Sequence, residues 1–78
     1  MPNIFLQHKA ELRLSYRTIA RSVGVQHGYV YRLLKDPGAY DNLRMINRVG
    51  FQLGMAPDEI TNEWIHLRIA HLIKRSGV

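Results

Sequence analysis

Residues 14–36, LSYRTIARSVGVQHGYVYRLLKD, constrain the fold of this chain more than any other stretch. Two apolar series with the spacing of a helix lie within it, namely Ile19, Ala20 and Val23, then Val30, Leu33 and Leu34. Ser15 stands just before the first series, where its hydroxyl can cap free backbone N–H groups. Gly24 breaks the pattern, and the second helix begins near Gln26. Two short helices joined by a tight turn with a glycine form a helix-turn-helix, so this motif is predicted over residues 15–35.

The outward positions of the second helix combine hydrogen-bonding tips, aromatic rings and cations. These positions hold His27, Gly28, Tyr29, Tyr31, Arg32 and Lys35. Such a face suits the floor of a DNA groove, where Arg32 could bridge both acceptors of a guanine. Alternatives stay open for single side chains. Arg32 could instead hold a phosphate or only water, and Tyr29 or Tyr31 could pack between helices, because the two point in different directions.

With these two helices, the chain is expected to form one all-α domain of five helices over residues 1–78. The three further helices are predicted over residues 4–13, 43–53 and 57–74. The stretch Asp36–Pro37–Gly38 is a strong helix breaker, which predicts a loop over residues 36–42. Gly50 lies inside a predicted helix, where glycine costs ~1 kcal/mol relative to alanine. We therefore expect another helix to approach closely at Gly50.

Residues 12–60 resemble the lambda-repressor-like, or Xre/Cro, family of helix-turn-helix DNA-binding proteins. The matching residues are Leu14–Ser15, Ile19–Ala20, Val23–Gly24–Val25, Val30 and Leu33, followed by Leu43, Ile46, Val49, Leu53–Gly54 and Asp58–Glu59–Ile60. The resemblance implies a five-helix fold with a long C-terminal helix, in which the second helix of the motif lies in the major groove. It also implies that the partner is double-stranded DNA.

The same resemblance implies DNA-binding roles for particular residues of this sequence. The face that reads bases would comprise His27, Gly28, Tyr29, Tyr31 and Arg32, next to Gln26. Contacts to the DNA backbone would come from Tyr16, Arg17, Lys35, Tyr40, Asn42 and Arg44. Gly28 and Tyr29 stand where the family commonly has small or medium polar residues, so its base preferences do not transfer to this chain.

The formal net charge is +5, and most of the excess lies in the half that holds the predicted motif. Residues 1–40 contain six Lys and Arg against two Asp and Glu, whereas residues 41–78 contain five against four. A basic surface attracts polyanions by releasing their condensed counterions. The chain has no cysteine, which excludes disulfides and fits a reducing cytoplasm. A DNA-binding protein in that compartment is expected to be associated with the nucleoid. Its apolar runs are too short to span a bilayer, so no membrane partner is expected.

The sequence offers no set of residues typical of an enzyme or a metal site. The four histidines, His8, His27, His66 and His71, are scattered along the chain. Glu63 and His66 have an i, i+3 spacing found in carboxylate metal sites, but such sites need several copies of it on facing helices. The sequence has neither a glycine-rich phosphate loop after a strand nor a credible nucleophile–base pair. We therefore expect no catalytic residues, no cofactor, no metal and no small-molecule ligand.

The helix predicted over residues 57–74 carries two apolar stripes. The first consists of Ile60, Trp64 and Leu67, and the second of Ile65, Ile69, Leu72 and Ile73. One stripe suffices to dock a helix on a small domain, so the surplus apolar surface needs a cover. A second copy of the chain is the simplest cover, which predicts a homodimer interface at Trp64, Ile65, Ile69, Leu72 and Ile73. The alternative is that this helix wraps round the domain and buries both stripes.

A sequence-specific DNA-binding transcriptional regulator is the function that these features predict. The chain resembles the small repressors of phages and mobile elements, which would bind an inverted-repeat operator as dimers and exclude polymerase from a promoter. The alternative is a protein-interaction adaptor on the same fold. DNA binding predicts a steep loss of affinity with salt, whereas an adaptor predicts little. Membrane-surface binding by the last helix is disfavoured by Glu59 and Glu63.

Overall fold

The computed structural model describes residues 3–77, and all of the regular secondary structure in them is helical. The elements are α1 (Ile4–Glu11), α2 (Tyr16–Val23), α3 (His27–Lys35), the short 3-10 helix η1 (Pro37–Ala39), α4 (Leu43–Gln52) and α5 (Pro57–Arg75). The prediction of an all-α chain with five α-helices is confirmed. The three helices outside the motif begin and end within two residues of their predicted bounds, and α2 and α3 lie within the motif predicted over residues 15–35.

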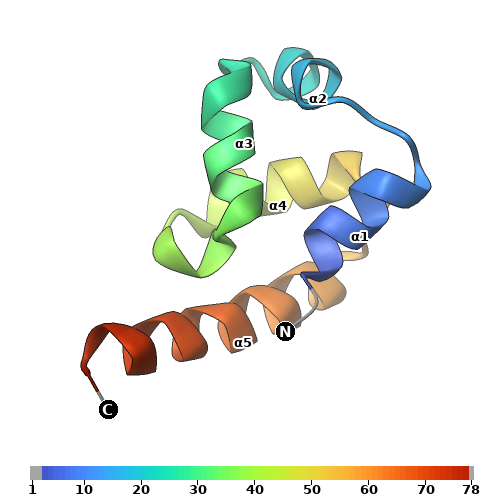
Figure 1. Cartoon of the computed structure of the whole chain (residues 1–78). Helices are drawn as coiled ribbons and strands as arrows, with labels where there is room; N and C mark the ends of the chain where they lie inside the picture. Colours follow the sequence, from blue (N-terminus) through green and yellow to red (C-terminus); the bar gives the residue numbers. More distant parts are fainter. Residues whose placement is uncertain (1–2, 78) are drawn as a thin grey trace.

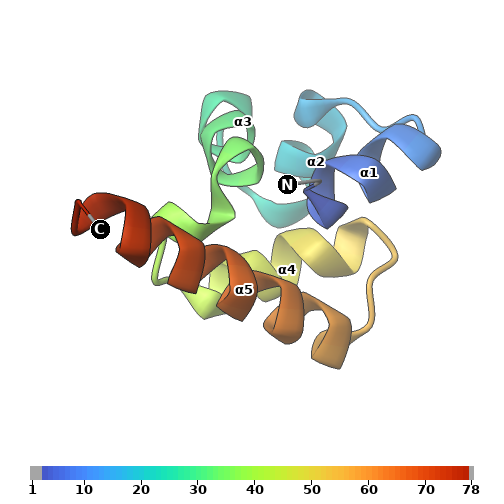
Figure 2. The ribbon, with the colours of Figure 1, turned by 60° about the horizontal axis from the view of Figure 1, so that its bottom comes forward.

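The helices α2 and α3 lie on the opposite side of the molecule from α5, and α4 runs between them (Figure 1). The N-terminal part of α5 packs on α4, and its middle packs on η1. The C-terminal part of α5 extends past the other helices (Figures 1 and 2). The molecule is accordingly elongated, 37 Å along its longest axis against 23 and 21 Å along the other two.

One hydrophobic core joins all five helices. Its buried side chains are Phe5, Ile19, Ala20, Val23, Val30, Leu33, Leu34, Ile46, Val49, Leu53, Met55 and Ile60. Every inward position predicted for α2 and α3 belongs to this set, so that part of the prediction is confirmed. Burying one large aliphatic side chain is worth about 1.5–3 kcal/mol, and this core therefore fixes α2 and α3 relative to each other.

Polar caps and a glycine set the ends of the helices. The side-chain oxygens of Asn3, Ser15 and Asn42 accept hydrogen bonds from backbone N–H groups three residues on, at 3.3, 3.1 and 3.2 Å. They cap α1, α2 and α4. Gly24 ends α2 in the left-handed conformation, with φ of 77°. Gln26 precedes α3 without a side-chain cap bond, as expected for a weak capping residue.

The first helix is shorter than predicted, because it ends at Glu11 and the prediction extended to Arg13. Arg13 has φ of 54°, a left-handed conformation that costs an ordinary residue about 1–2 kcal/mol. Its N–H donates to the Ala10 carbonyl at 3.1 Å, and the N–H of Leu14 donates to the Lys9 carbonyl at 3.2 Å. These bonds close the helix. A glycine would have indicated such an ending, whereas an arginine does not.

The predicted loop over residues 36–42 contains the short helix η1, whose Pro37 and Gly38 are buried. Gly38 lies directly against the backbone of α5. A Cβ on Gly38 would overlap the carbonyl oxygen of Leu67 and would lie 2.9 Å from the backbone nitrogen of Arg68. The close approach between η1 and α5 therefore requires glycine at this position.

The close approach predicted at Gly50 is confirmed. A Cβ on this residue would lie 2.7 Å from Cγ1 and 2.8 Å from Cδ1 of Ile60. Gly50 is buried, and Ile60 is 0% exposed. The helices α4 and α5 therefore meet here with no side chain of α4 between them.

We expect Gly50→Leu to lower the free energy of unfolding by about 1–3 kcal/mol, because the new side chain overpacks the α4–α5 contact. The ~1 kcal/mol that leucine gains over glycine inside a helix offsets only part of this loss. Thermal unfolding followed by circular dichroism measures the effect, with Gly50→Ala as the matched variant that adds only Cβ. A Gly50→Leu melting temperature equal to or above the wild-type value would contradict the contact.

Candidate nucleic-acid interface

The helix α3 exposes most of the residues predicted to read bases. Exposed side chains are those of His27, Tyr31, Arg32 and Lys35, while Gly28 and Tyr29 are half-buried. We call these six residues the α3 face. Arg32 lies back along the helix, so that its Nη1 is 3.5 Å from where a Cβ of Gly28 would be. The missing side chain of Gly28 thus leaves room for the guanidinium beside the helix.

Two tyrosines and two lysines from three helices form a stack along the α3 face. The rings of Tyr16 on α2 and Tyr31 on α3 meet edge to face, with centroids 5.2 Å apart and planes at 76°. Lys9 Nζ lies 4.2 Å from the Tyr16 centroid, and Lys35 Nζ lies 5.6 Å from the Tyr31 centroid. The ring quadrupoles attract both ammonium groups. Lys9 was not predicted, because its distance from Tyr16 depends on how α1 docks.

Tyr29 packs within the molecule instead of standing free. Its ring meets that of Tyr40 at a centroid distance of 6.0 Å and an angle of 75°, and both residues pack against the core. Of the two tyrosines for which packing was left open, Tyr29 is the one packed in this way. Tyr31 is the freer ring and is 44% exposed. Any contact of Tyr29 or Tyr40 with DNA has to use the part of the ring that this packing leaves accessible.

A shallow groove between α2 and the start of α3 brings together residues from both helices. It is lined by Arg17, Ala20, Arg21, Val25, Gln26, His27 and Gly28. Arg17, Arg21 and His27 are exposed around it. They converge at the N-terminal end of α3, where free backbone N–H groups also favour an anion. Arg21 was not among the predicted residues, although its i, i+4 spacing from Arg17 puts both on one face of α2.

The two residues predicted at the start of α4 lie outside these contacts. Asn42 is exposed, and its side-chain oxygen caps α4. Arg44 is exposed on the first turn of the same helix. Neither takes part in the ring and cation contacts found among the described residues. Asn42 and Arg44 therefore remain separate candidates for backbone contacts.

Arg48 supports the turn between α2 and α3. Its Nη2 donates a hydrogen bond to the carbonyl of Val23, the last residue of α2, at 2.8 Å. Carbonyls at the end of a helix lack helical partners, so this bond satisfies one of them and ties the turn to α4. Arg48 was not predicted, because the bond joins residues far apart in the sequence.

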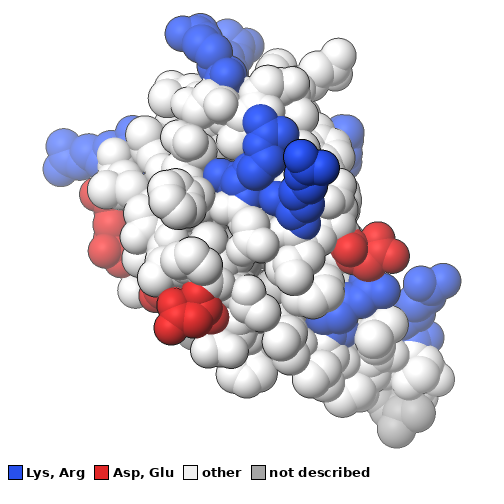
Figure 3. Space-filling model, turned by 180° about the vertical axis from the view of Figure 1, so that it is seen from behind, with Lys and Arg blue, Asp and Glu red and all other residues white. Residues whose placement is uncertain are grey.

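The cations of the described part of the chain are not neutralised by carboxylates. The acid–base contacts within 4.0 Å among residues 3–77 both use histidine, with His8 3.5 Å from Glu59 and His71 3.6 Å from Asp36. Figure 3 shows Lys and Arg side chains at the top, in the centre, at both edges and at the lower right of one face, with Asp and Glu nearer the edges. Their charges are available to an anionic partner, and such a partner would relieve their mutual repulsion.

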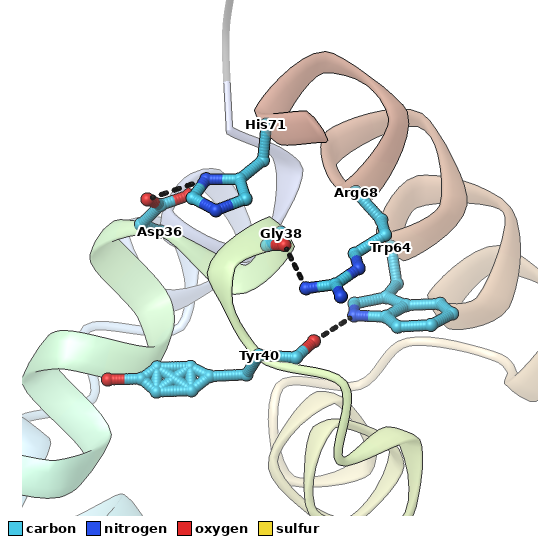
Figure 4. Close-up of polar contacts among 6 residues, drawn as sticks. All are labelled: Asp36, Gly38, Tyr40, Trp64, Arg68 and His71. Atoms are coloured by element: carbon cyan, nitrogen blue, oxygen red, sulfur yellow. Dashed lines mark hydrogen bonds and ion pairs between the residues drawn. The ribbon is translucent and has the colours of Figure 1, made fainter. Parts of the chain in front are cut away.

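Three side chains of α5 fasten the segment between α3 and α4 (Figure 4). Trp64 Nε1 donates to the Tyr40 carbonyl at 2.9 Å, Arg68 Nη1 donates to the Gly38 carbonyl at 3.0 Å, and His71 Nδ1 lies 3.6 Å from Asp36 Oδ2. We call these contacts the α5 clamp. Trp64, Arg68 and His71 are spaced i, i+4, i+7 and share one face of the helix. The clamp holds the C-terminal end of α3 at a fixed position relative to α5.

The second apolar stripe predicted on α5 is exposed. Ile65, Ile69, Leu72 and Ile73 are 40, 51, 45 and 53% exposed. We call these four residues the α5 stripe. The alternative that α5 buries both stripes within its own domain is wrong.

Trp64 belongs to the packing of the domain and not to the exposed stripe. With Ile60 and Leu67 it forms the first stripe, which packs against the core. Its indole N–H is bonded inside the chain, in the α5 clamp. Because ring and N–H already have partners, we leave Trp64 out of the surface available for dimerisation. The sequence could not separate Trp64 from its neighbours, because it does not show which stripe faces the domain.

Among residues 3–77, no three His, Cys, Asp or Glu side chains are placed to hold a metal ion together. Every helix in the same part of the chain is too short or too polar to cross a bilayer. No protein-family model matches the sequence, and searches against curated proteins and solved structures gave no significant match either. Function is therefore inferred from the residues and their geometry.

Proposed function

We propose that this chain is a sequence-specific DNA-binding transcriptional regulator of the lambda-repressor-like type, with α2 and α3 as its helix-turn-helix. The observation that carries the proposal is the α3 face, where cations without carboxylate partners stand beside an exposed tyrosine ring and histidine. A major groove admits one α-helix and offers hydrogen-bond acceptors and thymine methyl groups to such side chains. The helix α3 would lie in that groove while α2 crosses the backbone.

The proposed DNA contacts fall into two groups, those to base edges and those to the sugar–phosphate backbone. Arg32 and His27 are the proposed readers, since both are exposed on α3 and can bond to base edges. Arg17 and Arg21 line the groove at the start of α3 and would hold a phosphate there. Lys9 and Lys35, each held over a tyrosine ring, would flank the site as further backbone contacts.

The α5 stripe supports a homodimer. A two-fold dimer is the commonest oligomer, and it would cover apolar side chains that the domain leaves exposed. Two copies of α3 would then read two half-sites about 34 Å apart on an inverted repeat. In this arrangement the chain would act as the small repressors of phages and mobile elements do, by occupying a promoter in the nucleoid and excluding polymerase.

A protein-interaction adaptor is the second candidate, and the same α5 stripe favours it. Its four exposed aliphatic side chains could seat an apolar partner as well as a second copy. The dependence of binding affinity on salt concentration distinguishes the two candidate functions. DNA binding predicts that affinity falls steeply as salt rises, because counterions are released, whereas an apolar contact changes little.

Selection of bound fragments from random duplex DNA tests the proposal directly. A regulator is expected to enrich one inverted-repeat sequence from the pool. Titration of the enriched duplex at several salt concentrations should then give a steep slope. Recovery of no preferred sequence, together with salt-independent binding to other proteins, would favour the adaptor.

We expect Arg32→Ala and Arg17→Ala to weaken binding in different ways. Loss of Arg32 should cost about 1–3 kcal/mol at one operator position and relax the base preference there, because a bidentate contact is lost. Loss of Arg17 should weaken all duplexes alike and make the salt slope shallower by about one unit. Binding profiles over single-base operator variants measure both. If Arg17→Ala alters base preference while Arg32→Ala does not, the proposed orientation of α3 is reversed.

A further inference from the structure

A second groove lies between the C-terminal end of α3 and the C-terminal half of α5. The two helices form its walls, with the cations Arg32 and Lys35 on α3 and Lys74 on α5, and the apolar residues Leu67 and Ala70 also line it. Asp36 and His71 complete the lining. Lys74 was not among the residues predicted to bind DNA, and nothing in the helix-turn-helix pattern points to it.

Three cations and one acid line this groove. Its single acid, Asp36, faces His71 at 3.6 Å in the α5 clamp. Arg32, Lys35 and Lys74 have no carboxylate within 4.0 Å among the described residues. Arg32 and Lys35 of α3 and Lys74 of α5 all line the groove, and their positive charges favour an anion there.

The two walls of the groove are held at a fixed separation. Arg68 and Trp64 bond to the backbone of the segment that follows α3, and Gly38 lets that segment touch the backbone of α5. The backbone of α5 is therefore positioned relative to the segment after α3 before any ligand arrives. A preorganised site loses less entropy on binding than one that has to be assembled.

The groove stays open when the α5 stripe is covered. At 3.6 residues per turn, Lys74 is turned round the helix axis by about 100° from Ile73 and by about 140–180° from the other three residues of the stripe. A second copy seated on the stripe would approach α5 from the side away from the groove. The dimer interface and the groove can therefore be occupied together.

We propose that this groove binds the sugar–phosphate backbone of the duplex that α3 reads, and that Lys74 of α5 is a DNA-binding residue. The inference rests on the proposed function, because Arg32 and Lys35 belong both to the groove and to the α3 face. That continuity favours the same duplex as occupant. The apolar lining residues suit deoxyribose, and the cations suit phosphate. Free phosphate compounds share this chemistry and are the other source of the ligand.

The test compares Lys74→Ala with Arg75→Ala. Both variants remove one positive charge from the last turn of α5, but Arg75 does not line the groove. Both residues are exposed, so both variants are expected to fold. Lys74→Ala should weaken binding to specific and non-specific duplexes alike, by about 3- to 10-fold at low salt. It should also make the slope of log affinity against log salt shallower by about 0.9, the value of one phosphate contact. Arg75→Ala should leave the slope at its wild-type value.

The outcomes separate this inference from the proposed function. A steep wild-type slope with no change in Lys74→Ala overturns the inference alone, and so does an equal change in both variants, which would mean long-range attraction only. A wild-type chain that does not bind duplex DNA overturns both. In a second experiment, the chain is titrated with sodium triphosphate, and binding in the groove is measured from shifts of the amide NMR signals of Ala70 and His71. Competition between triphosphate and duplex supports the assignment, whereas triphosphate binding that the duplex does not displace would assign the groove to free phosphate compounds.

Discussion

Replacing Ile69 by aspartate is expected to give a helical monomer that binds its operator about 100- to 10,000-fold more weakly than the wild-type chain. Ile69 is 51% exposed in the single chain, so folding should tolerate the change. In a dimer the carboxylate would be buried against apolar side chains without a partner, a cost that dissociation removes. The separated domains then lose the link between half-sites. Sedimentation velocity at several protein concentrations and titration with operator duplex measure the two effects.

Ala56→Asp is the matched control for charge. It adds the same carboxylate to α5 at the N-cap position, which is exposed, has no side-chain cap bond and lies outside the α5 stripe. This variant should remain dimeric and gain about 1 kcal/mol of stability from the new cap. The dimer proposal fails if the wild-type chain stays monomeric at high concentration. It also fails if Ile69→Asp unfolds while Ala56→Asp does not, since the stripe would then belong to the domain's own core.

Gly38→Ala should lower the free energy of unfolding by about 3 kcal/mol or more, at the upper end of overpacking effects. The new Cβ would overlap the Leu67 carbonyl, which is backbone and cannot rotate away as a side chain can. Either η1 or α5 has to move, and the α5 clamp opens with it. For a domain of this size, the melting temperature should fall by roughly 12 °C or more. Differential scanning calorimetry measures the change.

Gly28→Ala makes the same chemical change where there is room for it. Its Cβ would meet only Arg32 Nη1 at 3.5 Å, an ordinary contact with a flexible side chain. Because Gly28 lies inside α3, alanine should raise stability by up to about 1 kcal/mol. Comparing Gly38→Ala with Gly28→Ala therefore separates the effect of a steric clash from the effect of replacing glycine by alanine. A Gly38→Ala chain that melts within a few degrees of the wild type would show that η1 and α5 are not packed as described.

The local part of the fold could be predicted from the sequence, because short-range chemistry determines it. The apolar period of α2 and α3 identified their buried faces, and Ser15 marked the start of α2 with a side chain that does cap it. Gly50 indicated a helix contact, because glycine destabilises a helix interior and a close approach by another helix compensates for that cost. The left-handed backbone conformation of Arg13 could not be predicted, because arginine is not typical of that conformation.

Contacts between elements could not be predicted, because they depend on how the helices dock. The bond from Arg48 to Val23 and the placement of Lys9 over Tyr16 join residues on different helices whose relative position no local pattern encodes. The same limit applied to α5. Its two stripes were visible in the sequence, but only packing shows that Trp64 faces inward and Ile69 outward.

The position of the single tryptophan lets its fluorescence report on the docking of α5 within the chain. Trp64 belongs to the α5 clamp, where its indole N–H donates to the Tyr40 carbonyl (Figure 4). Its emission therefore follows the docking of α5 on the segment after α3, and it does so without a label. Variants such as Ile69→Asp and Lys74→Ala should keep the native emission spectrum, whereas Gly38→Ala should shift it as the indole becomes hydrated.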